Sequence, residues 1–102
     1  MTELSEQFRL VAKEWVEADA AANLLEETKS AVLSQKMNAL GDMAVSKAEM
    51  QVKASPDWTD HVTRMVKARE VANLLKVKME WMRMRFSEWQ SAEANKRAEM
   101  KL

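Results

Sequence analysis

The sequence predicts an all-α fold, a long coiled-coil-like hairpin in which two long helices are linked by a short one. Three observations favour this class. One glycine and one proline occur among 102 residues, so few positions interrupt a helix. Strong helix formers make up most of the chain, and apolar residues recur at alternating spacings of three and four, the pattern of coiled-coil helices. A chain of this length is expected to form one domain, residues 1–102.

The first long helix is expected over about residues 3–40. From Leu4 to Leu25 its apolar residues alternate at spacings of four and three, as along a heptad repeat. The pattern breaks at Lys29 and resumes four residues later. Gly41 can adopt the positive φ that commonly ends a helix, so the helix is expected to stop just before it.

A short helix is expected over about residues 47–54. Ser46 and Glu49 have the S-x-x-E spacing of a capping box, in which each side chain satisfies a free backbone N–H at the helix start. We therefore expect Ser46 to be the N-cap.

The last helix is expected over about residues 56–100, because Ser55 supplies an N-cap and Pro56 suits the first helical position. Its apolar residues form two lines. The first, called the inner seam below, comprises Met65, Ala68, Ala72, Leu75, Met79, Met82, Phe86 and Trp89. The second, called the outer face, comprises Val66, Leu74, Val77, Trp81 and Met84.

The inner seam and the outer face lie roughly 150° apart around the helix, at about 100° per residue. One antiparallel helix of the same chain covers only one of these two lines. The other, which includes Trp81, would be an apolar patch larger than monomers usually expose. We therefore predict a homo-oligomer whose interface is the outer face.

Charge is unevenly distributed, although the net charge is zero. Residues 1–27 hold seven acidic and two basic residues, whereas residues 60–86 hold seven basic and three acidic residues. In one interpretation, antiparallel packing or subunit assembly pairs the two segments; in the other, part of the basic segment stays open to a polyanion. The bases of the last helix form two stripes, with Arg69, Lys76 and Arg83 on one side and Lys67, Lys78 and Arg85 on another.

No residue pattern points to catalysis, to a metal or to a cofactor. The chain has no cysteine and one histidine, His61, which is expected to be a surface or capping residue. A glycine-rich phosphate loop is also missing. We expect no catalytic residue and predict that the protein is not an enzyme. Neither a secretory signal nor a membrane-spanning apolar run is visible, which favours an intracellular protein.

Three stretches between residues 25 and 99 carry a family resemblance. The first runs through Leu25, Glu26, Lys29, Leu33, Lys36 and Met37 to Gly41 and Asp42. The second runs through Glu49, Met50, Ser55, Pro56 and Asp57. The third runs through Ala68, Arg69, Lys76, Val77, Arg83, Met84, Trp89, Gln90, Ser91, Arg97 and Glu99. The first two resemble phage recombination mediators of the UvsY type, and the third resembles small phage proteins encoded among recombination genes.

The resemblance implies a small helical protein that assembles into a ring-like homo-oligomer and binds single-stranded DNA. It also implies that the protein helps a recombinase displace single-strand-binding protein, in the cytoplasm of a bacterial host cell. The family's basic pair near the end of the first long helix falls here on Ser34 and Lys36, so one of the two charges is present.

We expect phosphate contacts first from the lysines around the turn at Gly41 and Asp42, which are Lys29, Lys36, Lys47 and Lys53. The second group of expected contacts lies on the last helix and comprises Arg69, Lys76 and Arg83. Trp58, Trp81 and Trp89 are candidate surfaces on which bases stack. The competing hypothesis is a helical protein-interaction module without nucleic-acid binding, such as a phage structural adaptor or an inhibitor of a host enzyme. The zero net charge, which is unusual for a nucleic-acid binder, favours that alternative.

Overall fold

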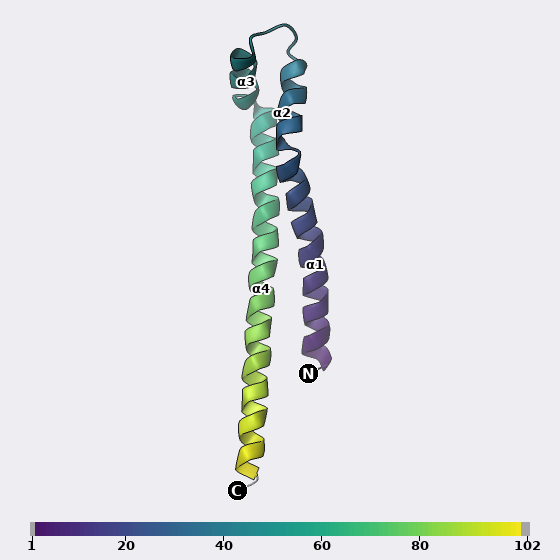
Figure 1. The fold of residues 1–102 in the computed structure, drawn as a ribbon, viewed down its shortest axis with the longest axis vertical. Coiled ribbons are helices and arrows are strands. Elements are labelled where there is room, and N and C mark those ends of the chain that lie inside the picture. Colours follow the sequence, from purple (N-terminus) through teal and green to yellow (C-terminus); the bar gives the residue numbers. More distant parts are fainter. Residues whose placement is uncertain (1, 101–102) are drawn as a thin grey trace.

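The chain forms an elongated hairpin. The computed structural model describes residues 2–100, which extend over 84 × 18 × 17 Å with a radius of gyration of 23.2 Å. A compact domain of this length has a radius of gyration of about 13 Å. One arm consists of α1 (Thr2–Glu27) and α2 (Lys29–Asn38), α3 (Val45–Lys53) lies at the closed end, and α4 (Pro56–Met100) is the other arm (Figure 1). The all-α hairpin predicted from the sequence is confirmed.

The first arm is interrupted at Thr28, where the sequence pattern predicts one continuous helix. The backbone N–H and the hydroxyl of Thr28 both donate to the carbonyl oxygen of Leu24, at 3.0 and 2.6 Å. A threonine hydroxyl that bonds back to the preceding turn competes with regular helix geometry and bends the helix. α2 therefore begins at Lys29, the residue at which the apolar pattern breaks, and Gly41 beyond its end has a φ of +81°.

α3 begins two residues earlier than expected, and the predicted capping box is wrong. Its N-cap is Ala44, and no side chain bonds to the free N–H groups at its start. Because the helix starts at Val45, Ser46 lies inside the first turn. The carboxylate of Glu49 accepts a hydrogen bond from Nζ of Lys53 instead, at 2.6 Å.

α4 starts at the Ser55–Pro56 pair. The hydroxyl oxygen of Ser55 accepts a hydrogen bond from the N–H of Trp58, at 3.3 Å, and its hydrogen is donated to the carbonyl of Val52, at 2.6 Å. Ser55 thus caps α4 and ties it to the end of α3. The 45 residues of α4 span about 68 Å at 1.5 Å per residue, which sets the length of the molecule.

The hydrophobic core lies between α1 and the inner seam of α4. Val11, Met79 and Met82 are buried at its centre. Around them pack Leu4, Phe8, Ala12, Trp15 and Leu75. Farther toward the closed end, Ala22 and Ala72 have no exposed surface, and their small side chains allow the two helices to approach closely.

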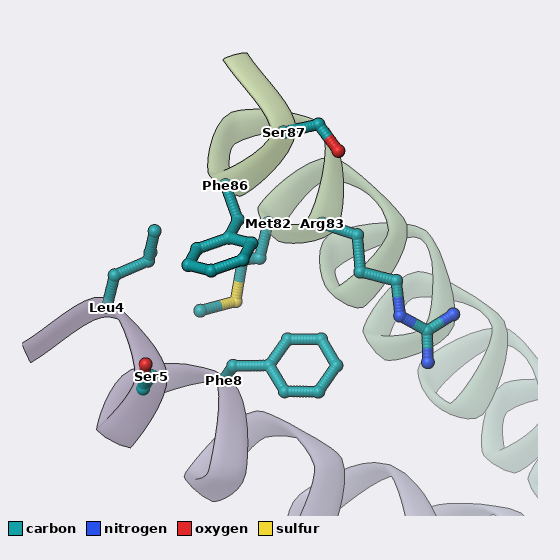
Figure 2. Close-up of a pocket in the computed structure, with 7 residues that line it drawn as sticks. All are labelled: Leu4, Ser5, Phe8, Met82, Arg83, Phe86 and Ser87. Carbon is teal, nitrogen blue, oxygen red and sulfur yellow. The ribbon is translucent and has the colours of Figure 1, made fainter. Parts of the chain in front are cut away.

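The core opens at the end of the hairpin that holds the N-terminus. Figure 2 shows Leu4 and Phe8 of α1 facing Met82 and Phe86 of α4 across a pocket of about 470 Å³. α4 then continues beyond the start of α1 (Figure 1). The last part of the inner seam therefore has no stretch of α1 packed against it, and Trp89 is 41% exposed.

Candidate functional site

The outer face of α4 is open to solvent. The five side chains that define it are between 53% and 63% exposed, with Trp81 the least exposed of them. α1 packs against the opposite side of the helix, so nothing in the described chain covers this line. The guanidinium of Arg85 lies over the ring of Trp81, 5.2 Å from its centroid. A base and an exposed aromatic ring are therefore paired on the same surface.

A row of bases runs beside the outer face. Lys67, Lys78 and Arg85, called the basic row below, lie within about 20° of one another around α4. All three are exposed, and none has a carboxylate within ion-pair distance among residues 2–100. The basic row is one of the two basic stripes visible in the sequence, and none of its three residues is among the phosphate contacts that the sequence predicts.

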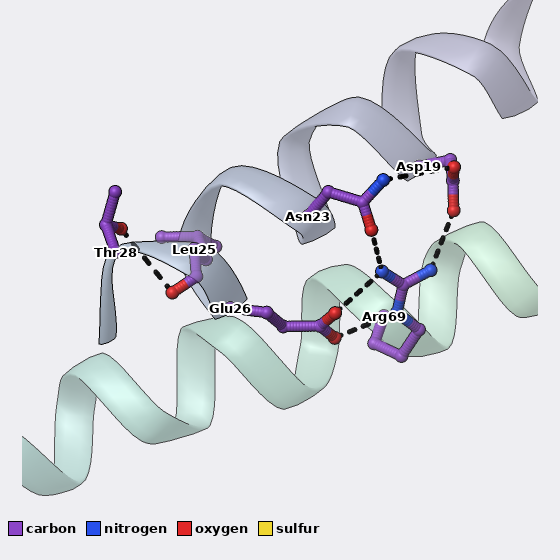
Figure 3. Close-up of polar contacts among 6 residues, drawn as sticks. All are labelled: Asp19, Asn23, Leu25, Glu26, Thr28 and Arg69. Carbon is purple, nitrogen blue, oxygen red and sulfur yellow. Dashed lines mark hydrogen bonds and ion pairs between the residues drawn. The ribbon is translucent and has the colours of Figure 1, made fainter. Parts of the chain in front are cut away.

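Arg69, an expected phosphate contact, is held by α1 instead (Figure 3). Its Nε and Nη2 donate to the two carboxylate oxygens of Glu26, at 2.9 and 2.8 Å. Its Nη1 donates to Asp19 at 2.7 Å, and Nη2 also donates to the side-chain carbonyl of Asn23 at 2.6 Å. This guanidinium therefore joins the acidic segment to the basic segment within one chain.

The same contacts shift the proton affinities of the pair. Hydrogen bonds from Arg69 hold the pKa of Glu26 below its ordinary value, and those from Glu26 and Asp19 raise the pKa of Arg69. Both side chains are consequently charged at neutral pH. A bidentate arginine–carboxylate pair also has a defined geometry, so the cluster can form at only one alignment of α1 and α4 along their length.

The other expected phosphate contacts divide into paired and unpaired bases. Lys53 pairs with Glu49, and Lys36 lies 3.9 Å from Asp57. Lys29, Lys47, Lys76 and Arg83 have no carboxylate partner within the described part of the chain. These four are distributed over α2, α3 and α4, so they do not form one compact cluster.

Two of the three tryptophans proposed for base stacking are accessible. Trp81 and Trp89 are exposed, and Trp89 stacks on Phe86 with 6.1 Å between ring centroids. Trp58 is 6% exposed and stacks on His61, so the prediction that it offers a stacking surface is wrong. It is buried because the inner-seam spacing extends back to the first turn of α4.

His61 is also buried, contrary to the expectation of a surface histidine. It lines a groove between α2 and the start of α4, and its Nε2 has no hydrogen-bond partner among residues 2–100. Sequence reasoning missed this position although a signal was present. Residues 58, 61, 65 and 68 continue the three-four spacing of the inner seam, which predicts that His61 faces the first arm.

Within residues 2–100, no helix is both long and apolar enough to cross a membrane, and no three His, Asp or Glu side chains gather in a way that suits a metal ion. Comparison with protein families, with curated proteins and with solved structures finds no match to this chain.

Proposed function

We propose that this protein is a non-enzymatic accessory factor of phage recombination that binds single-stranded DNA as a homo-oligomer and assists loading of a recombinase. The observation that carries the proposal is the exposed outer face of α4 with the basic row along its edge. One surface then offers apolar area for assembly, and the adjoining surface offers positive charge for a phosphate backbone. The recombination context comes from the resemblance to mediators of the UvsY type.

A second copy of this chain is the occupant that we assign to the outer face. The five half-exposed residues present on the order of 500 Å² per chain, a size at which an apolar patch often marks an interaction site. Two copies would bury about 1,000 Å² before flanking residues are added, which is close to the lower limit for a specific interface. A single monomer seldom exposes a larger apolar patch. Self-association is thus the simplest way to remove this area from water.

DNA binding would then depend on the number of copies. Each chain contributes a few unpaired bases, whereas an assembly repeats them along one surface. Because the second and later contacts are intramolecular, weak single contacts add to a useful affinity despite zero net charge. Trp89 lies outside the outer face and is exposed, so it would add base stacking without sequence preference.

A helical protein-interaction module is the second candidate function. The internal pairing of Arg69, Lys36 and Lys53 favours it, because those bases are already partly neutralised within one chain. The zero net charge points the same way. In this case the outer face would bind a helix of another protein, and no nucleic acid would be involved.

The first experiment measures binding of a labelled oligodeoxythymidylate by fluorescence anisotropy at about 50 and 200 mM salt. The logarithm of affinity should fall with the logarithm of salt with a slope of roughly −0.7 per phosphate neutralised. Replacing Lys78 and Arg85 by alanine should weaken binding and flatten that slope. The control replaces Glu6 and Arg9 together, which removes a neutral pair on α1 outside the expected phosphate contacts and should leave the slope unchanged.

Absence of single-strand binding by the wild-type chain at about 50 mM salt would refute the DNA-binding proposal and leave the protein-interaction module. The assembly is tested separately by light scattering. Trp81→Glu should dissociate the oligomer, whereas Val16→Glu, at a similarly exposed position on α1, should not. A wild-type protein that scatters as a single chain at micromolar concentration would contradict the assigned occupant.

A further inference from the structure

A polar groove lies between α2 and the first turns of α4, near the closed end of the hairpin and separate from the outer face. α2 contributes Val32, Gln35 and Lys36 to its lining. α4 contributes Asp57, Asp60, His61, Thr63, Arg64 and Lys67. Side chains from two helices that are distant in the sequence therefore converge on this groove.

His61 is the unexplained group in the groove. Only 6% of its surface is exposed, and Nε2 has no partner among the described residues. Buried polar atoms in folded proteins nearly always have a hydrogen-bond partner, and an unpaired one is costly. A ligand atom that accepts a hydrogen bond from Nε2–H would supply the missing partner.

The charges around His61 favour an anion. Nζ of Lys36 lies 3.9 Å from a carboxylate oxygen of Asp57, at the outer limit of an ion pair, and Asp57 is exposed, so this pair contributes little. Arg64 and Lys67 have no carboxylate within ion-pair distance in the part of the chain that the structure describes. Three cations thus stand against two carboxylates.

We propose that this groove binds a phosphate group. The guanidinium of Arg64 suits two phosphate oxygens at once, Lys67 and Lys36 add positive charge from opposite helices, and His61 Nε2–H is the innermost donor. Nε2 is closed off from solvent, so binding requires side chains that line the groove to move apart and expose this atom. A backbone phosphate of single-stranded DNA is the first source, which rests on the proposed function, and free pyrophosphate offers the same chemistry.

His61 is the sole histidine, so its imidazole gives one set of signals in a long-range ¹H–¹⁵N NMR spectrum of the full, untagged chain. The spectrum is recorded during titration with an oligodeoxythymidylate and, separately, with sodium pyrophosphate. We expect the Nε2 signal to shift in a saturable way. Replacing Arg64 and Lys67 by alanine should weaken the binding that causes this shift by about tenfold or more. The matched control, Lys96→Ala with Arg97→Ala, lies on the far part of α4 and should leave the shift unchanged.

The two probes separate the two sources. A shift of the His61 Nε2 signal with the oligonucleotide identifies a DNA phosphate as the ligand. A shift with pyrophosphate, in a protein that does not bind DNA, supports the phosphate site in the groove and refutes the proposed function. If DNA binds by anisotropy and the His61 signal stays fixed with both probes, the groove is not a phosphate site and the proposed function stands. An equal shift in the Arg64→Ala, Lys67→Ala variant, with its circular dichroism unchanged, would also overturn the inference.

Discussion

Replacing Met82 by alanine tests whether the inner seam is the part of α4 that stabilises the monomer. Met82 is 3% exposed and packs in the cluster of Val11 and Met79 between the two arms. Truncating a buried methionine costs about 2–5 kcal/mol, and more where the surroundings cannot collapse. Because the cluster adjoins the open pocket beside Phe86, we expect the lower end, about 2–3 kcal/mol.

Met84→Ala is the matched control, since it removes the same atoms two residues away on the outer face, where Met84 is 62% exposed. Its cost to folding should stay within about 0.5 kcal/mol. The free energy of unfolding is measured by urea denaturation followed by circular dichroism at 222 nm. The variants are compared at a protein concentration at which they have the same association state, because assembly shifts apparent stability. Equal losses for Met82→Ala and Met84→Ala would refute the assignment of the two faces.

Three further predictions concern local contacts. Ser55→Ala removes the cap on the N–H of Trp58 and should cost about 1 kcal/mol in urea denaturation; an unchanged midpoint would mean that the cap is not needed. Gly41→Ala places a side chain at φ +81° with nothing within 4 Å of the new Cβ, so only backbone strain should appear, about 1–2 kcal/mol, and Gly41→Asn should recover part of it. Because Arg69 lowers the folded-state pKa of Glu26, the stability from this pair is fully present above the unfolded-state value of 4.5 and is lost as pH falls through the lower folded value. The midpoint temperature of unfolding should therefore fall less steeply with acidification below about pH 4.5 in Glu26→Gln than in the wild type. The same pH dependence in both proteins would contradict a contribution of this pair to stability.

Sequence reasoning succeeded where neighbouring residues alone decide the structure. Pro56 has no N–H to lose and a φ suited to a first helical turn, and Ser55 needs only the N–H three residues ahead to act as a cap. Gly41 adopts a positive φ because it lacks Cβ. The spacing of apolar residues likewise separates the inner seam from the outer face of α4, since helical geometry is the same whatever packs against it.

Local reasoning failed where two candidate partners compete within one turn. Glu49 can reach back toward Ser46 or forward to Lys53, and the sequence pattern does not rank the two. The structure has the ion pair with Lys53, and α3 begins at Val45 without a side-chain cap. Thr28 presents the same difficulty, because its hydroxyl either points to solvent or bonds back to the carbonyl of Leu24 and interrupts the arm.

By itself the sequence determined that the chain is helical, that it folds into a hairpin and that α4 has an apolar side left over. Tertiary structure alone decided which charged side chains have no ion-pair partner among the described residues, and that His61 is buried. Arg69 meets Glu26 and Asp19, 43 and 50 residues earlier in the chain, only because the arms are aligned at one particular register. His61 is buried only because the first arm, after its break at Thr28, lies against the start of α4. Contacts of this kind depend on the positions of two distant segments relative to each other, which residue type and spacing along one helix do not specify.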